Sequence, residues 1–304
     1  MLVGRGDLAL SVIVLVLTQL TFGLGDAMAN FDQKILRMSD RKEMLSKEFG
    51  REFDGIRYVV LAEVHDNLAV QKAQAASMQA ILNRQSRVDF TTAWEFLDFS
   101  DQASVADAYS RFHSGEFVGD QFMKLLFPSA SSSVPHPSYL PIFNVTSEHN
   151  GHLLSTNLSR SEKAPVVQGG IANAMPGTVP DGFAMGGAGY EKRFTDVMSG
   201  GHANQSQIAN YFAAQCLTDD VIAKHLVEES SDFLKFLVIG SFHADYNDGV
   251  VKRIQVRDAE SEVKVIRFID VSDYAESEIE AAIQDPAYGA VGDYVWFVNE
   301  PAAE

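Results

Sequence analysis

The chain has 304 residues, of which 24 are Lys or Arg and 41 are Asp or Glu, so its formal net charge at pH 7 is −17. This acidic balance argues against nucleic acid and anionic membrane surfaces as partners, because both would repel the protein. The single cysteine, Cys216, excludes an internal disulfide, and a chain of this length buries enough apolar surface to fold without one.

Residues 1–29 have the layout of a secretory signal peptide. Arg5 provides a short positive region, an apolar run covers Leu8–Phe22, and Ala27–Ala29 forms a small-x-small cleavage site. An uncleaved membrane anchor is the alternative, but the run is short for a span. No cysteine follows that could carry a lipid. We therefore expect a periplasmic protein with a single α/β domain over residues 30–304.

Short β-branched runs then alternate with stretches that carry apolar residues at helical spacing. The sequence predicts strands over 57–62, 90–96, 152–156, 236–239, 263–269 and 294–298, and helices over 68–82, 101–112 and 207–229. Strands separated by helices favour a mainly parallel central sheet flanked by helices. Pro128–Pro141 and Asn173–Tyr190 are rich in Gly, Pro or Ser. We expect loop insertions there, either binding loops or disordered surface segments.

Polar side chains follow four of the predicted strands. Glu63 and His65 follow the first strand, Glu95 ends the second, Asn157 ends the third and His243 follows the fourth. Ligands of open parallel sheets bind beyond the carboxyl ends of the strands. A single Glu or His at such a position is a weak signal, but four strands that end this way predict a site in one crevice.

The helix predicted over 207–229 places two polar residues on its apolar stripe. Gln215 and Asp219 share this stripe with Ile222 and Leu226. Buried polar groups need hydrogen-bond partners, so these two either pin the helix to the sheet or face the crevice. Cys216 beside them is most simply a small buried apolar residue.

Several sequence blocks resemble the ChaN-like haem-binding uptake family, in the family's order and from about residue 57 to 300. The blocks are AEVHDN (62–67), WEF with DQ (94–96, 101–102), YLPIF (139–143), NLSR (157–160), GH (201–202), AQ with D and A (214–223), G-x-x-H with GV (240–250) and DYVWF (293–297). Three positions depart from the family: Ala62 replaces Gly, and Leu140 and Asp245 stand where Arg is common. Lost arginines remove two groups that could bind a carboxylate.

The resemblance implies an α/β protein that binds haem and acts in iron acquisition. It also implies a homodimer that encloses cofactors between subunits, and an outer-membrane haem receptor as a further partner. Tyr139 and His136 are the first candidates for a haem-iron ligand, with Tyr246 behind them, since ferric haem accepts either side chain. For both, ordinary packing or a solvated loop position is the alternative. The other positions matched to a cofactor site are Asn157, Arg160, His202 and Gln215.

A hydrolase is the competing interpretation, because the family is similar to erythromycin esterases and TraB/TIKI proteases. Glu63 or Glu95 would then act as general base, with His65 and His243 as proton shuttle or ligands of a divalent metal such as Zn or Mn. No Gly-x-Ser-x-Gly motif indicates a serine hydrolase. A third alternative is a binding module whose crevice residues are structural.

Overall fold

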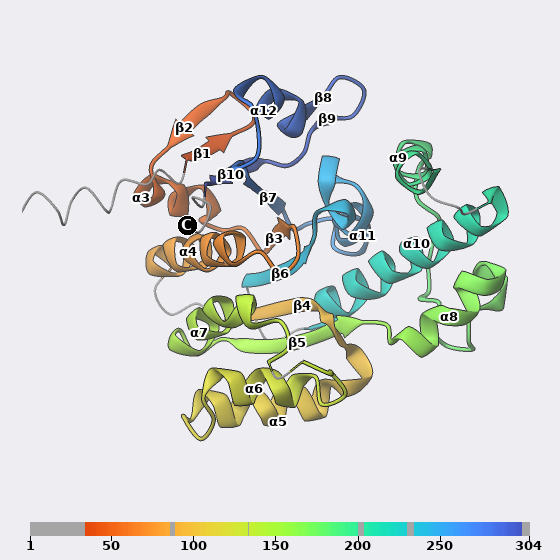
Figure 1. Cartoon of the computed structure of the whole chain (residues 1–304), viewed down its shortest axis with the longest axis horizontal. Coiled ribbons are helices and arrows are strands. Elements are labelled where there is room, and N and C mark those ends of the chain that lie inside the picture. The colour runs from red at the N-terminus through yellow and green to blue at the C-terminus, as the bar shows by residue number, and fades with distance from the viewer. Residues whose placement is uncertain (1–33, 86–88, 133, 200–203, 230–233, 300–304) are drawn as a thin grey trace, which may run out of the picture. The chain divides into compact units, whose positions relative to one another are not determined.

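A computed structural model of the chain describes residues 34–85, 89–132, 134–199, 204–229 and 234–299 (Figure 1). The predicted signal peptide and His202 lie outside the described residues. In the described part of the chain one sheet has the strand order β2-β1-β10-β7-β3-β6-β4-β5. Its strands are β1 (Lys34–Arg37), β2 (Lys42–Met44), β3 (Tyr58–Glu63), β4 (Phe90–Asp98), β5 (His152–Asn157), β6 (Leu234–Gly240), β7 (Val263–Asp270) and β10 (Tyr294–Val298).

The pairs β10–β7, β7–β3, β3–β6, β6–β4 and β4–β5 are all parallel. The antiparallel pairs of this sheet, β1–β10 and β1–β2, lie at one edge. The described residues thus confirm the predicted α/β class with a mainly parallel sheet. A separate antiparallel pair is formed by β8 (Gln284–Asp285) and β9 (Gly289–Ala290).

Helices cover both faces of the sheet. They are α3 (Ser46–Phe49), α4 (Leu68–Arg84), α5 (Gln102–His113), α6 (Gly119–Leu126), α7 (Leu140–Glu148), α8 (Arg160–Gly169), α9 (Ala188–Ser199), α10 (Gln205–Glu228), α11 (Gly249–Arg257) and α12 (Glu276–Ile283). In Figure 1, α4 and α7 lie on one side of the central strands and α10 and α11 on the other. None of the described helices combines the length and apolar character that crossing a bilayer requires.

The sequence of the central strand β3 is apolar almost throughout because the strand is buried on both faces. All six of its residues are buried. Val59 and Leu61 pack into the core on the α4 face, while Val60 and Ala62 pack with residues of α10 and α11 on the other face. A strand buried on both faces is nearly continuously apolar. The first polar residue, Glu63, therefore marks the end of the strand.

Both predicted loops end sooner than expected. A 3₁₀ turn covers Pro137–Tyr139, and α7 begins at Leu140, so the prediction of a loop through Pro141 is wrong for its last residues. Proline fits the first turn of a helix, where its missing N–H has no intrahelical partner, so Pro141 does not mark a loop. Likewise α9 begins at Ala188, which leaves 174–187 as the long loop of this region.

Candidate functional site

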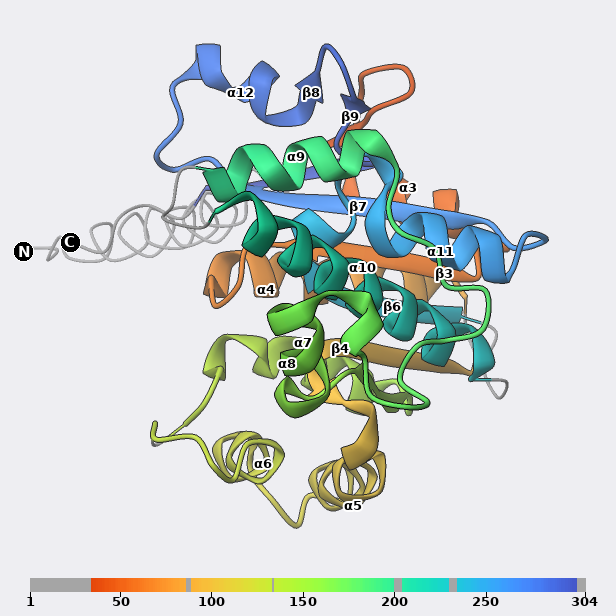
Figure 2. The ribbon, with the colours of Figure 1, turned by 90° about the vertical axis from the view of Figure 1, so that its right-hand side faces the viewer.

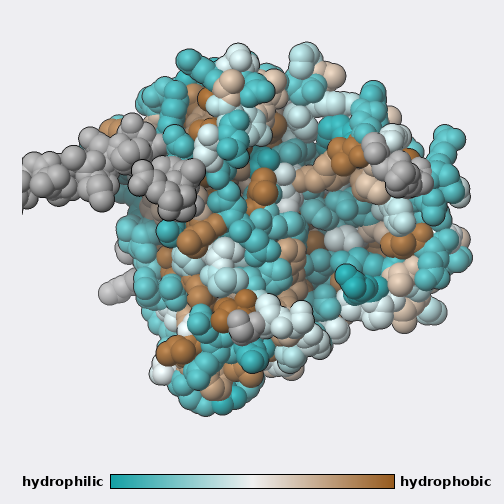
Figure 3. Space-filling model, in the orientation of Figure 1, coloured by the Kyte–Doolittle hydropathy of each residue, from teal (hydrophilic) through white to brown (hydrophobic). Residues whose placement is uncertain are grey.

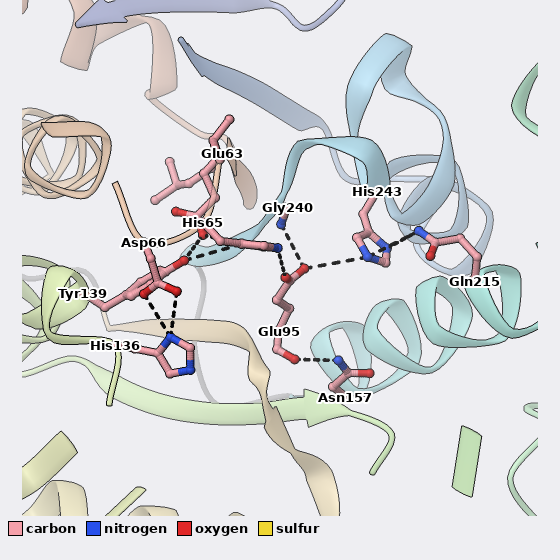
Figure 4. A network of polar contacts seen from close by, with 12 residues as sticks. Glu63, His65, Asp66, Glu95, His136, Tyr139, Asn157, Gln215, Gly240 and His243 are labelled. Carbon is pink, nitrogen blue, oxygen red and sulfur yellow. Dashed lines mark hydrogen bonds and ion pairs between the residues drawn. The ribbon is translucent and has the colours of Figure 1, made fainter. Parts of the chain in front are cut away.

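A row of carboxyl and imidazole groups crosses the carboxyl ends of the central strands (Figure 4). Glu63 at the end of β3 accepts hydrogen bonds from Gln71 Nε2 at 2.6 Å and from the Tyr139 hydroxyl. His65 Nδ1 lies 3.1 Å from Glu63 Oε1, and its Nε2 lies 3.0 Å from Glu95 Oε1. One imidazole therefore joins the carboxyl groups of two strands.

The row continues to a second imidazole beyond β6. His243 Nε2 lies 3.8 Å from Glu95 Oε2, and its Nδ1 lies 2.5 Å from Asp219 Oδ1. The backbone N–H of Gly240 donates to Glu95 Oε2 at 2.9 Å. A Cβ atom at Gly240 would lie 2.8 Å from His65 Cε1, so glycine is needed for this close approach. Three carboxyl groups and two imidazoles thus alternate along the sheet edge.

These contacts shift the protonation of the groups in the row. Hydrogen bonds to Glu63 and Glu95 raise the pKa of His65 to about 10, so this imidazole is cationic at neutral pH. Burial raises the pKa of Glu63 despite the hydrogen bonds from His65 and Tyr139. Burial also acts to raise the pKa of Glu95, but the bond to His65 and the charge of His243 outweigh it and lower that pKa.

The arrangement suits proton sharing better than metal coordination. Both nitrogens of His65 face carboxylates, and a protonated imidazole has no lone pair for a metal. Within the described ranges, no group of three or more His, Cys, Asp or Glu side chains could hold a metal ion. The structure gives no support to the predicted metal-ligand role of His65 and His243.

A hollow of about 630 Å³ opens on the β4–β5 side of the row. Its lining combines aromatic and apolar side chains with two cations, and consists of Glu95, Phe96, Asp98, Phe127, His136, Asn157, Leu158, Arg160, Lys163, Ala164, Val167 and Gln168. We call it the β5 hollow. Its volume is in the range of small-molecule and cofactor sites.

His136 lines the β5 hollow from the loop before α7. Its Nδ1 lies 2.9 and 3.0 Å from the two carboxylate oxygens of Asp66. Its ring packs against Phe96, with centroids 4.8 Å apart, and against Phe127, with centroids 5.1 Å apart. The Nε2 atom has no hydrogen-bond partner among the described residues, and Figure 4 shows it pointing away from Asp66.

Two cations of α8 border the same hollow. Arg160, the first residue of the helix, is exposed, and Lys163 lies one turn later and is partly buried. Lys163 Nζ donates to Asn157 Oδ1 at 3.3 Å. Burial lowers the pKa of Lys163, although Asp98 and Glu95 oppose the shift. Lys163 was not among the predicted site residues, because its place one turn after Arg160 depends on helix α8, which was not predicted.

A second hollow of about 410 Å³ lies on the α9–α10 side of the row, and we call it the α9 hollow. Glu63, His65, Gln215 and His243 line it together with apolar side chains, namely Val64, Phe194, Val197, Met198 and Phe242. Figure 2 views the molecule from the side where α8, α9 and α10 lie in front of the sheet. The row of acids and imidazoles therefore borders two hollows.

Comparison with known proteins identifies a family to which the chain is similar. The family described as haem-binding uptake, Tiki superfamily, ChaN matches residues 51–254, about two thirds of the chain. The chain belongs to this family. The resemblance found in the sequence blocks is thereby confirmed.

Two solved structures show the same fold as this family member. One is described as cofacial heme binding to ChaN of Campylobacter jejuni; it is 21% identical, with a TM-score of 0.68 over 88% of this chain and 97% of that one. The other, the type III effector HopBA1, is 12% identical, with a TM-score of 0.50 over 89% of this chain and 97% of that one. No curated protein matches the chain significantly.

The predicted site residues of this ChaN-family protein fall into separate groups. Glu63, His65, Glu95 and His243 form the row, as the strand-end pattern predicts. His136, Asn157 and Arg160 line the β5 hollow, and Gln215 lines the α9 hollow. Tyr139 lines neither hollow; it is fully buried, and its ring centroid lies 4.5 Å from that of Trp94.

Two further predicted site residues, Tyr246 and His202, are not part of either group. Tyr246 lines neither hollow; its ring contacts Arg193 at 4.6 Å and Tyr288 at 5.5 Å. His202 falls outside the described residues. On α10, Asp219 is fully buried and accepts a hydrogen bond from the Tyr190 hydroxyl at 2.9 Å, whereas Gln215 Nε2 lies 3.0 Å from His243 Nδ1. Asp219 thus pins the helix in the core, and Gln215 faces the crevice.

Proposed function

We propose that this protein binds haem in the periplasm for haem and iron uptake, and that the β5 hollow holds the cofactor. The family supports the cofactor class. The observation that carries the assignment to this hollow is His136, whose Nδ1 is held by Asp66 while its Nε2 is left for an iron atom. Imidazole is a common haem-iron ligand, and it binds through one nitrogen while the other donates to an acceptor.

The remaining lining fits the rest of a haem molecule. Phe96 and Phe127 next to His136, with Val167 on the opposite helix α8, offer apolar contact to a porphyrin ring. Arg160 and Lys163 supply positive charge for two propionates. Arg160 belongs to the NLSR block shared with the family, so of the two α8 cations only Lys163 could compensate, in this proposal, for the arginines absent at positions 140 and 245.

Tyr139 is the second candidate for the iron ligand. Its hydroxyl donates to Glu63 and its side chain is fully buried. Burial and the neighbouring charge of Glu63 raise its pKa, whereas iron binding requires the tyrosinate form. We therefore assign the iron ligand to His136 rather than to Tyr139.

Several parts of the proposal rest on the family and on the sequence alone. The periplasmic location follows from the signal peptide predicted over residues 1–29. The homodimer follows from the resemblance, and cofacial heme binding is reported for the Campylobacter jejuni ChaN structure. An outer-membrane receptor would deliver the haem.

A hydrolase remains the second candidate function, and the row favours it. Glu63 is a buried carboxyl group with a raised pKa beside a cationic imidazole, a combination that suits general acid–base chemistry. The lining of the α9 hollow does not indicate which class of substrate would be hydrolysed. A hydrolytic activity that Glu63→Gln abolishes while haem binding stays intact would establish this candidate.

The assignment of the propionates gives a sharp test of the β5 hollow. The double variant Arg160→Ala with Lys163→Ala should weaken binding of ferric haem by about 100-fold or more, since two charge-assisted hydrogen bonds of about 1.5–3 kcal/mol each are lost. Binding of haem dimethyl ester, which lacks the propionate charges, should change much less. Equal losses for haem and its ester would argue against propionate contacts at α8.

A further inference from the structure

We propose that a third hollow, beside α11, binds a zwitterionic dipeptide with apolar side chains. It has a volume of about 460 Å³ and lies between the loop of residues 174–187 and helices α10 and α11, and we call it the α11 hollow. Its lining combines charged side chains of both signs with apolar residues and glycines, and consists of Asp181, Gly182, Ala184, Met185, Gly186, Gly187, Asp220, Asp248, Lys252, Arg253, Val256 and Arg257. It shares no lining residue with the β5 hollow or the α9 hollow, so this inference is independent of the proposed haem site.

The long loop before α9, predicted to be either a binding loop or a disordered segment, forms one wall of the α11 hollow. Figure 2 shows it passing beside α10 and α11. Two arginines of α11 hold its backbone: Arg253 Nη2 donates to the carbonyl of Ala184 at 3.4 Å, and Arg257 Nη2 donates to that of Asp181 at 3.3 Å. A wall that is fixed in advance lowers the entropy cost of binding a ligand.

The most buried part of the lining pairs its own charges. Asp220 is 4% exposed, and its carboxylate accepts two hydrogen bonds from Arg257, at 2.9 and 2.7 Å. Arg253 is 9% exposed, and its Nη1 lies 3.7 Å from Asp219 Oδ2. These ion pairs make a polar base for the hollow and require no charge from a ligand.

The exposed part of the lining leaves one charge of each sign unpaired. Neither Lys252 nor the carboxylate of Asp181 has an ion-pair or hydrogen-bond partner among the described residues. Lys252 lies five residues before Arg257, which contacts Asp181, so the two charges are separated by about 7.5 Å along α11. Two extended residues span about 7 Å, so the ammonium and carboxylate ends of a dipeptide match this spacing.

Apolar side chains and open space complete the α11 hollow. Met185 is 45% exposed and Val256 is 77% exposed, although large apolar side chains gain from burial. A Cβ atom added at Gly182 or Gly187 would have no other atom within 4 Å, so the space above the loop backbone is free. Aliphatic side chains of a dipeptide would fill this space and cover Met185 and Val256.

The test titrates leucyl-leucine into the purified protein by isothermal calorimetry. We expect saturable binding at one site with a Kd below about 1 mM, as befits a ligand of this size. Glycyl-glycine, which keeps both charges and lacks the aliphatic side chains, should bind at least about tenfold more weakly. No saturable binding of leucyl-leucine, or equal affinity for the two dipeptides, would overturn the inference.

Charge recognition is tested by matching each variant with a blocked ligand. Lys252→Gln should weaken leucyl-leucine by about tenfold or more and leave the affinity for leucyl-leucine amide, which has no carboxylate, unchanged. Asp181→Asn should weaken leucyl-leucine to a similar extent and leave the affinity for N-acetyl-leucyl-leucine, which has no ammonium group, unchanged. A loss that is the same for the free and the blocked dipeptide would contradict the assigned contacts.

Lys72→Gln and Asp273→Asn are the matched controls, because both residues are exposed and have no partner among the described residues. They should bind leucyl-leucine as the wild type does, and losses equal to those of the test variants would show a general charge effect and overturn the site. Lys252→Gln and Asp181→Asn should both bind ferric haem as the wild type does. A wild-type protein that binds the dipeptide but no haem would overturn the proposed function and leave the α11 hollow standing.

Discussion

Three imidazoles near the strand ends differ in what their nitrogens face. Both nitrogens of His65 lie near carboxylates, and His243 lies between Asp219 and Glu95. His136 has one nitrogen toward Asp66 and one without a partner among the described residues. The chemistry at each residue is therefore set by its hydrogen bonds, and this difference is the basis on which we propose His136 as the iron ligand.

Removing the buried hydroxyl of Tyr139 tests this distinction. Tyr139→Phe should bind ferric haem with the wild-type Soret maximum, because the phenol bonds to Glu63 inside the protein rather than to iron. Glu63→Gln should behave in the same way. Absorption spectra of the haem complexes are the measurement. A shifted or missing Soret band in Tyr139→Phe, with the wild-type fold by circular dichroism, would make Tyr139 the ligand.

The ion pairs of His65 predict a dependence of stability on pH. Its pKa is raised from 6.5 to about 10 by folding, so its stabilising contribution is complete below pH 6.5 and is lost as the pH rises through 10. His65→Gln should therefore be less stable than wild type at pH 6, and the difference should shrink as the pH rises toward 10 and vanish above it. Urea unfolding at several pH values measures this. A difference that is constant with pH would contradict it.

Some site residues could be predicted from the sequence and others could not. Glu63, Glu95 and His243 were found because polar residues after apolar strands meet at one edge of a parallel sheet. The pair of Asp66 and His136 was missed, since it joins two loops 70 residues apart and depends on left-handed backbone at both. Local patterns contain no signal for such a contact.

Among the elements, the start of α4 fixes the turn that carries His65 and Asp66 and follows Glu63 at the end of β3. Asn67 Oδ1 accepts the backbone N–H of Val70 at 3.1 Å, and its Nδ2 bonds to Asp270 on β7. One residue thus caps the helix and ties the turn to the sheet.

Replacing this cap should destabilise the protein measurably. Asn67→Ala should lower the free energy of unfolding by about 0.5–2 kcal/mol, the usual range for losing an N-cap. Lys72→Ala, an exposed change on the same helix, should stay within about 0.5 kcal/mol of wild type. Denaturant unfolding compares the three proteins. Equal stability of the two variants would show that the cap contributes nothing.

The prediction of elements succeeded where periodicity was strong. All six parallel strands were expected near their observed positions, because strands buried on both faces give continuous apolar runs. The hairpin β1–β2 was missed, since β1 has four residues and β2 has three. The starts of α7 and α9 were hidden by proline and glycine, which indicate loops but also occur in or next to the first turn of a helix.

At the scale of the whole molecule, the sheet collects polar side chains from chain segments that are far apart in sequence. The surface seen in Figure 3 is mostly hydrophilic, in keeping with the excess of acidic residues. Such a surface suits a protein that carries a small ligand in solution and avoids anionic polymers. The fold class and the edge of the sheet that carries the site could be predicted from the sequence pattern. The β5 hollow and the α9 hollow could not, because their shapes depend on how α8 and α9 pack.

The location of the protein can be tested by its processing. On expression in a Gram-negative host, the periplasmic fraction should contain a protein whose first residue is Asn30, because cleavage is predicted after Ala29. N-terminal sequencing and cell fractionation provide the measurement. A chain that keeps its first 29 residues and sediments with the membranes would support the uncleaved anchor instead.

The most direct test of the central claim is a titration of ferric haem into the purified protein and into His136→Ala, followed in the Soret region. We predict a saturable, red-shifted band with a defined stoichiometry for the wild type, and a weaker complex with a different Soret maximum for His136→Ala. No saturable change in the wild type would contradict haem binding, and identical titrations of the two proteins would contradict the β5 hollow and His136 as the iron site.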